Sequence, residues 1–300
     1  MRILLLGANG QVGHELRRSL APLGEIVVTT RSGRLEDGNP CEIADLDQPD
    51  SLDGLVERIA PDWVVNAAAY TAVDRAESEA DAAFRANAES PGVLAAACVR
   101  RGAKLVHYST DYVFPGDGSR PYREDDATSP LGVYGASKLA GEEAIRATGD
   151  AHLIFRTAWV YASHGHNFLR TMLRLGAERD ELRVVADQIG TPTPAALIAD
   201  VTAQAMASWP QATGVFHLTA QGRASWKEFA DAIFAGARRR GLIAREPRVL
   251  PITTADYPTP ARRPAFSCLD TTRLRNDFAI ALPTWEQGLD RVLDELAAKA

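Results

Sequence analysis

The sequence predicts an α/β protein in which helices cover both faces of a parallel sheet. Continuous apolar runs alternate with helical patterns across the first half of the 300-residue chain, as strands and crossover helices do in a doubly wound sheet. A glycine-rich turn follows the first apolar run directly. After residue 156 the alternation thins and proline becomes more frequent, which indicates a second region of different construction.

Five apolar runs are the expected strands of this sheet. They are rich in valine, isoleucine and leucine without regular polar alternation, which suits strands buried on both faces. The strands are expected at 2–7, 24–30, 62–69, 103–110 and 152–161, and the helices at 12–23, 50–60, 83–102 and around Tyr134.

The second half is expected to form a smaller region. Residues 1–156 would make the sheet and residues 157–300 this second region, although the patterns at 187–209 and 214–220 could return to the first sheet. Residues 253–274 indicate an extended loop that is too long to be a mere connector and is therefore expected to be functional. An amphipathic helix at 283–300 ends the chain.

Composition and charge argue against several classes of protein. The net charge of −6 disfavours broad binding to nucleic acid or to an anionic membrane. Cys41, Cys98 and Cys268 are far apart and form no CxxC motif, so they indicate buried thiols of a cytoplasmic protein. The apolar run after Met1 is too short for a signal sequence, and no run is long enough to span a bilayer. The oligomeric state stays open, with a homodimer as one option.

The turn GANGQVG connects the first strand to the first helix. Gly7, Gly10 and Gly13 would let the backbone approach a pyrophosphate, which the amides and dipole of the helix N-terminus then stabilise. The spacing is GxxGxxG rather than GxGxxG, and a tight turn that only packs helix against strand is the alternative. Its position at the end of the first strand favours a Rossmann-type dinucleotide site.

The end of the second strand bears on the choice of cofactor. An acidic residue there would indicate NAD, but the stretch VVTTRSGR has Thr30 followed by Arg31. Arg31 and Ser32 could hold a 2′-phosphate, which favours NADPH. A solvated loop arginine is the alternative, and NADH stays open. Asp45 is suited to contact adenine, and the small residues of 66–71 leave room for the cofactor.

Tyr134 and Lys138, in the stretch VYGASKLAGE, lie one helical turn apart and share a helix face. An ammonium ~5 Å away would stabilise the phenolate by roughly 3 kcal/mol, which would make Tyr134 a tuned acid. The same spacing also arises by chance, so the pair alone is weak evidence for a catalytic site. Ser109 and Thr110 end a central strand, at the edge where open α/β sheets bind ligands. These hydroxyls would complete a proton-delivery set for reducing a carbonyl.

These motifs together resemble the extended short-chain dehydrogenase/reductases, and among them the dTDP-4-dehydrorhamnose reductase family. The stretches that carry the resemblance are GANGQVG, NAAAYTAVD, YSTDYVFPG, SPLGVYGASKLAGE, FRTAWVY, DQIGTPT and YPTPARRP, and they cover essentially the whole chain. The resemblance implies a Rossmann-type doubly wound parallel sheet with a smaller C-terminal substrate-binding region. It also implies NADPH-dependent reduction of the C4 ketone of dTDP-4-dehydrorhamnose to dTDP-L-rhamnose, for cell-surface polysaccharide.

The resemblance further implies a role for each matching residue. Tyr134 would protonate the C4 oxygen, Lys138 would lower the pKa of Tyr134 and hold the nicotinamide ribose, and Thr110 would hydrogen-bond the same oxygen. The expected substrate-binding residues are Thr110, Asp111, Trp159, Arg262 and Arg263; a core position for Trp159 and a surface position for the two arginines are the alternatives. The expected cofactor-binding residues are Gly7, Gly10, Gln11, Val12, Gly13, Thr30, Arg31, Asp45, Leu46, Ala69, Tyr70, Thr71, Tyr108, Tyr134 and Lys138.

Some members of this family are described with a magnesium ion that acidic side chains hold. Glu15 is placed for such a role, but the stretch PTPAALIAD offers no carboxylate before Asp200. Mg²⁺ binding is therefore doubtful, and no metal site is assigned. His164 and His166, in SHGHN, are interpreted as part of a polar loop rather than a metal site.

Two other functions are weighed on the same fold. A sugar-nucleotide dehydratase needs an Asp–Glu pair after the threonine, whereas Asp111 is followed by Tyr112. A non-catalytic, NADP-binding regulatory subunit would keep the fold and the nucleotide pocket. The intact set of Thr110, Tyr134 and Lys138 weighs against this second alternative.

Overall fold

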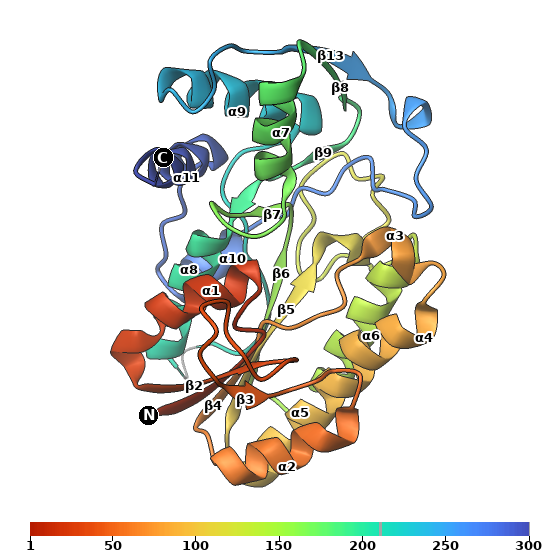
Figure 1. Ribbon diagram of the computed structural model, residues 1–300. Helices are drawn as coiled ribbons and strands as arrows, with labels where there is room; N and C mark the ends of the chain where they lie inside the picture. The colour runs from red at the N-terminus through yellow and green to blue at the C-terminus, as the bar shows by residue number, and fades with distance from the viewer. Residues whose placement is uncertain (210–211, 300) are drawn as a thin grey trace.

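A seven-stranded parallel sheet forms the larger part of the protein (Figure 1). The structure is a computed structural model and describes residues 1–209 and 212–299. The strand order is β11-β6-β5-β4-β1-β2-β3, and all neighbouring strands are parallel. The strands are β1 (Arg2–Leu6), β2 (Glu25–Thr30), β3 (Glu42–Ile43), β4 (Trp63–Asn66), β5 (Lys104–Thr110), β6 (His152–Thr157) and β11 (Gly214–His217). The predicted doubly wound sheet is confirmed.

Helices cover both faces of this sheet. Successive side chains of a strand point to opposite faces, and β1 follows this rule: Leu5 lies in one core cluster and Leu4 in the other. Both faces are apolar, which is why the strands have continuous apolar sequences. One face is covered by α1 (Gln11–Ser19), α8 (Ala195–Ala207) and α10 (Thr272–Asp277), and the other by α2 (Pro49–Ile59), α5 (Ser90–Arg101) and α6 (Val133–Arg146).

The strand order creates a crevice at one edge of the sheet. β1 lies between β2 and β4, so the chain winds outward from β1 in both directions. Open α/β sheets bind ligands at this switch point, beyond the carboxyl ends of the strands. The GANGQVG turn follows β1 at this edge.

The expected helix 83–102 consists of more than one element. After α3 (Val73–Ala76) and α4 (Ala80–Phe84), a π-helical turn at Arg85–Glu89 precedes α5. α6 lies directly against this turn, because a Cβ on Gly141 would stand only 2.0 Å from the Asn87 carbonyl oxygen. The π-helical turn is wide and Gly141 has no side chain, so the backbones of the turn and of α6 come into contact.

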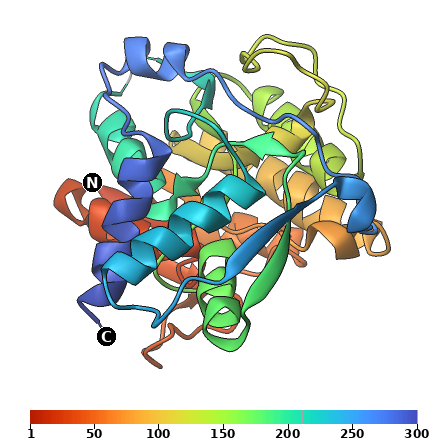
Figure 2. The ribbon, with the colours of Figure 1, turned by 90° about the horizontal axis from the view of Figure 1, so that it is seen from above.

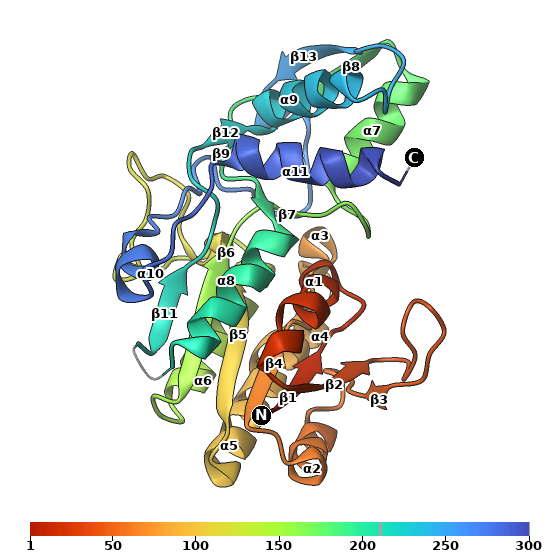
Figure 3. The same cartoon turned by 90° about the vertical axis from the view of Figure 1, so that its left-hand side faces the viewer.

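The smaller part lies beyond the carboxyl edge of the sheet, as Figure 3 and the view from above in Figure 2 show. Its core contains Phe229, Phe234 and Leu293. Its helices are α7 (Phe168–Glu178), α9 (Trp226–Arg239) and α11 (Trp285–Ala297). Three short strand pairs accompany them: β8 (Glu181–Val185) with β13 (Arg248–Ile252), β7 (Val160–Tyr161) with β10 (Thr193–Pro194), and β9 (Ile189–Gly190) with β12 (Ala224–Ser225).

The predicted strand at 152–161 and the predicted loop at 253–274 differ in part from the structure. The strand expected at 152–161 ends at Thr157, because Trp159 has a left-handed backbone with φ of 48° and cannot continue a strand. The loop 253–274 is mostly irregular but bridges back to the segment 117–122 through Phe266 and Leu269.

Several elements after residue 156 belong to the large sheet. β11 pairs with β6, and α8 packs on α1. The division of the chain at residue 156 stays a prediction, and any boundary must assign these elements to the first part. Within residues 1–209 and 212–299, every helix is too short or too polar to cross a membrane.

Candidate active site

A cavity of about 550 Å³ opens at the switch point of the sheet. Twelve of the fifteen expected cofactor-binding residues line it: Gly7, Gly10, Gln11, Val12, Thr30, Arg31, Leu46, Ala69, Thr71, Tyr108, Tyr134 and Lys138. Asn9, Ser32, Ala44, Ala67, Ala68, Ala86, Ser109, Thr157 and Val160 complete the lining. The cavity thus runs from the glycine turn to the Tyr134 helix, which is the path that a dinucleotide would take.

Close backbone contacts require glycine at two positions of the glycine turn. Gly7 has φ of 79°, and a Cβ there would meet the Ala68 nitrogen at 2.7 Å. A Cβ on Gly13 would meet the Gly7 carbonyl oxygen at 2.0 Å, so α1 begins in direct contact with the turn. Gly10 is the N-cap and offers no side-chain cap to the first amides of α1. These amides and the helix dipole fit an anionic group such as a pyrophosphate.

Arg31, which follows β2 and lines the cavity, already faces two carboxylates. Its guanidinium lies 3.4 Å from the Asp45 carboxylate and 4.0 Å from that of Asp47, and its side chain is 71% exposed. A 2′-phosphate at Arg31 would therefore compete with these acids. Asp45 itself accepts the Asp47 amide and does not line the cavity.

Tyr70 and Gly13 do not line the cavity either. The Tyr70 hydroxyl donates to Glu79 at 2.7 Å, and its backbone amide donates to the Asn87 side chain. Tyr70 therefore supports the loop that carries Ala69 and Thr71.

Tyr134 and Lys138 both line the cavity from α6, as their spacing predicts. Burial, and then the Asp111 carboxylate, raise the pKa of Tyr134 to about 12, while a hydrogen bond with Thr110 lowers it. Burial lowers the pKa of Lys138 to about 8. Lys138 is not among the groups that shift the pKa of Tyr134, and its nitrogen contacts His107 at 3.2 Å.

Thr110 and Asp111 lie at the end of β5, next to Tyr134. The Thr110 hydroxyl donates to the Asp111 carboxylate at 2.9 Å. Asp111 is 2% exposed, and this burial raises its pKa to about 6. The pair is thus a polar group beside the phenol, where the oxygen of a carbonyl substrate would lie.

Trp159 lies where β6 passes into the smaller part. Its ring stacks on Trp226, with 3.5 Å between ring centroids and 4° between planes. A Cβ on Gly190 would come within 2.4 Å of the Trp159 ring, so glycine is required there. Trp226 in turn donates to the Gln188 side chain at 3.2 Å. The indole of Trp159 is therefore held in a fixed orientation.

The two arginines of the 253–274 loop differ in their surroundings. Arg263 donates to the Asp74 carboxylate at 2.8 Å and lies close to Tyr112. Arg262 is exposed. Arg263 therefore holds the loop against α3. Neither Arg262 nor Arg263 lines the cavity.

The carboxylates expected near a magnesium ion have other partners. Glu15 accepts a hydrogen bond from His164 at 2.9 Å, and Asp200 accepts from Arg18 and Ser19. His14, Glu15 and His164 bring three ligand atoms within 4.8 Å of one another. Two nitrogen ligands do not fit the oxygen preference of Mg²⁺. His166 is exposed.

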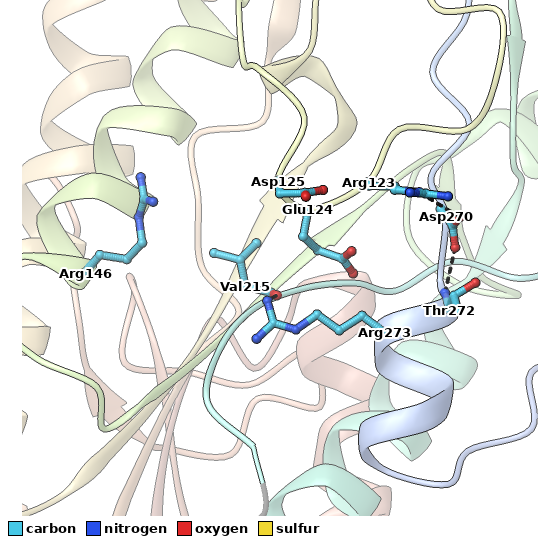
Figure 4. A pocket seen from close by; sticks show the side chains of 8 residues that line it. All are labelled: Arg123, Glu124, Asp125, Arg146, Val215, Asp270, Thr272 and Arg273. Carbon is cyan, nitrogen blue, oxygen red and sulfur yellow. Dashed lines mark hydrogen bonds and ion pairs between the residues drawn. The ribbon is translucent and has the colours of Figure 1, made fainter.

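A second cavity, of about 630 Å³, lies at the β11 edge of the sheet (Figure 4). Its three arginines and three carboxylates balance in charge. Arg273 donates to the Val215 carbonyl, and Arg123 lies 3.8 Å from Asp270. The lining residues are Arg123, Glu124, Asp125, Arg146, Val215, Asp270, Thr272 and Arg273. None of these residues lines the first cavity.

Known proteins match this chain over its whole length. The family model described as RmlD substrate binding domain matches residues 1–298. A dTDP-4-dehydrorhamnose reductase of Burkholderia thailandensis is 50% identical over 308 residues, covering 100% of each chain. Another, of Shigella flexneri, is 48% identical over 299 residues, covering 99% of this chain and 98% of the relative. The chain belongs to the dTDP-4-dehydrorhamnose reductase family. The predicted family is confirmed.

Solved structures of the dTDP-4-dehydrorhamnose reductase family share the fold. A Bacillus anthracis member, solved in complex with NADP, has a TM-score of 0.89 at 37% identity, covering 98% of this chain and 99% of that chain. A UDP-glucose 4-epimerase of Thermotoga maritima has a TM-score of 0.80 at 18% identity, covering 100% and 99% of the two chains, and this likeness concerns the fold alone.

The sequence did not reveal the polar residues behind the cavity. Asn66 is the last residue of β4, and His107 lies within β5. Glu142 follows Lys138 by one helical turn in α6. Glu142 forms a buried ion pair with Arg156 of β6 at 2.7 Å. The spacing of Tyr134, Lys138 and Glu142 at i, i+4 and i+8 was the available signal.

Proposed function

We propose that the protein reduces the C4 ketone of dTDP-4-dehydrorhamnose to the alcohol of dTDP-L-rhamnose with NADPH. The observation that carries the proposal is the meeting of Thr110, Tyr134 and Lys138 at the carboxyl edge of the sheet, where Tyr134 and Lys138 line a cavity that begins at the glycine turn. The family supports this function, since relatives of 45–50% identity are named for it.

Each residue of the site has a proposed role in the reduction. NADPH, when bound, supplies a hydride to C4. Tyr134 donates its phenolic proton to the C4 oxygen, and Thr110, which lies beside Tyr134, orients that oxygen. Lys138 holds the nicotinamide ribose. Asp111 and Trp159 are proposed to contact the sugar, and Arg262 and Arg263 the diphosphate.

The product test uses the purified protein with NADPH and the 4-keto substrate, made in place by the preceding enzymes. We expect NADPH oxidation at 340 nm and dTDP-L-rhamnose by NMR. No product with NADPH demonstrably bound would support the non-catalytic regulatory subunit instead. The dehydratase stays excluded, because Tyr112 occupies the position of the required glutamate. A cytoplasmic location, where NADPH and nucleotide sugars occur, is part of this proposal.

A substitution at Arg31 tests the choice of cofactor. If the guanidinium binds the 2′-phosphate, Arg31→Ala should weaken NADPH binding by about 1–3 kcal/mol and spare NADH. Dissociation constants of both cofactors, measured by fluorescence titration, provide the comparison. Arg34→Ala is the matched control, since Arg34 is an exposed arginine of the same loop that donates to the Gly38 carbonyl. Equal losses for both cofactors would show that Arg31 does not discriminate between them.

A further inference from the structure

A chain of buried polar groups leads to Lys138 from behind the cavity, and its first two members are not used by the mechanism above. It runs from the end of β4 through β5 to α6, and it consists of Asn66, His107 and Lys138. The three residues are 1%, 1% and 2% exposed, respectively. Hydrogen bonds in such a place must match donor to acceptor, because unmatched buried polar groups are costly.

A backbone amide fixes which groups donate and which accept along this chain of hydrogen bonds. The Ala68 amide donates to Oδ1 of Asn66 at 3.2 Å, and a backbone amide can only donate. Asn66 therefore presents its Nδ2 donor to Nδ1 of His107, 3.2 Å away. Nδ1 must accept this bond, so the neutral ring carries its hydrogen on Nε2. That Nε2–H group faces the Lys138 nitrogen at 3.2 Å.

A lysine nitrogen can accept a hydrogen bond only as the uncharged amine. We propose that Asn66 and His107 are positioning residues that lower the proton affinity of Lys138 in the empty site, so that its uncharged amine forms at mildly alkaline pH. Lys138 would hold the nicotinamide ribose of a bound cofactor, and its nitrogen would then take one proton from the solvent buffer to become an ammonium. This inference rests on the proposed function, since it requires the nicotinamide cofactor to bind beside Lys138.

The other groups around Lys138 agree with this direction. The titratable groups that face it are His107 of β5 and Glu142 of α6, with Tyr134 on the same helix face. Burial lowers the pKa of Lys138 to about 8, and Glu142 only partly opposes it, since Glu142 is paired with Arg156. Burial also keeps the pKa of His107 well below its usual value, so its ring is neutral.

Burial and the Asp111 carboxylate raise the pKa of Tyr134. An ammonium on Lys138 would oppose this shift, because a nearby positive charge stabilises the phenolate. Cofactor binding that favours the charged form of Lys138 would therefore also favour proton transfer from Tyr134.

Calorimetry tests the coupling of cofactor binding to proton uptake. NADP⁺ is titrated into the full-length protein at pH 9 in two buffers of different ionisation enthalpy, and the slope gives the number of protons taken up. From the Lys138 pKa of about 8, we expect about nine-tenths of a proton per NADP⁺ at pH 9. Absence of NADP⁺ binding would contradict the proposed function. Binding without proton uptake would overturn this inference alone.

The variant Asn66→Asp reverses the donor–acceptor direction of these hydrogen bonds. It therefore separates the proposed role from a merely structural one. In Asn66→Asp, one carboxylate oxygen still accepts the Ala68 amide, and the other accepts from Nδ1 of His107. Nε2 of His107 then becomes an acceptor for an ammonium, so Lys138 is charged before the cofactor binds. We expect proton uptake at pH 9 to fall at least about threefold, while melting curves report a folded protein.

His107→Gln should keep the proton uptake of the wild type, because its amide oxygen accepts from Asn66 and its amide nitrogen still donates to Lys138. His152→Gln is the matched control: His152 is a 4% exposed histidine of β6 that contacts the Gly149 carbonyl and lies outside the cavity. It should also keep the proton uptake of the wild type. Equal proton uptake in Asn66→Asp and the wild type would refute the proposed chain.

Discussion

Tyr134→Phe is expected to lower turnover by a factor of about 10²–10⁴, while NADPH affinity changes by less than about threefold. The substitution removes only the proton that the C4 oxygen receives. The ring itself stays packed, since its contact with Tyr112 is an edge-to-face one with centroids 5.7 Å apart. Initial rates from NADPH absorbance and a binding titration with the same protein separate the two effects.

Tyr122→Phe is the matched control for this experiment. Tyr122 is 7% exposed, its hydroxyl accepts the Gly118 amide, and it lies outside the cavity. Its loss should leave turnover within a few-fold of the wild type. Turnover near the wild-type value in Tyr134→Phe would mean that another group, with Asp111 the nearest acid, delivers the proton.

Local patterns were sufficient to predict the sheet and the two ends of the cavity. The glycine turn and the pair of Tyr134 and Lys138 are each defined within a few residues, where backbone geometry fixes what can share a face. Continuous apolar runs predicted buried strands because both faces of this sheet are covered. These parts depend on sequence neighbours, so a sequence reveals them.

Contacts between distant segments could not be predicted in this way. Trp159 stacks on Trp226, 67 positions later in the chain, and the left-handed backbone of Trp159 ends β6 early. The π-helical turn before α5 matches a glycine of α6. Likewise, the direction of the Asn66–His107 chain depends on a backbone amide, which carries no sequence signal.

Arg156→Leu is expected to lower the free energy of unfolding by about 3–5 kcal/mol, because it leaves a buried carboxylate without its cation. Arg156 and Glu142 are 3% and 0% exposed, and the guanidinium donates to both carboxylate oxygens. The guanidinium also lies 5.1 Å from the Phe114 ring centre, and this contact is lost too. Urea denaturation followed by circular dichroism measures the change.

Arg58→Leu is the matched control. Arg58 pairs with Glu42 at 2.9 Å, but these side chains are 57% and 37% exposed, so solvent screens the pair. The control should cost less than about 1 kcal/mol. Similar losses in the two variants would show that burial does not determine the cost.

The double variant Glu142→Leu with Arg156→Met distinguishes a missing partner from a damaged core. Both charges are then absent and the side chains keep similar volumes, so most of the lost stability should return. Glu142 also accepts from Ser109, which lines the cavity, and lies on the same helix face as Tyr134 and Lys138. The double variant should therefore fold yet reduce the ketone more slowly than the wild type. If stability and turnover both return fully, the ion pair does not align the catalytic helix.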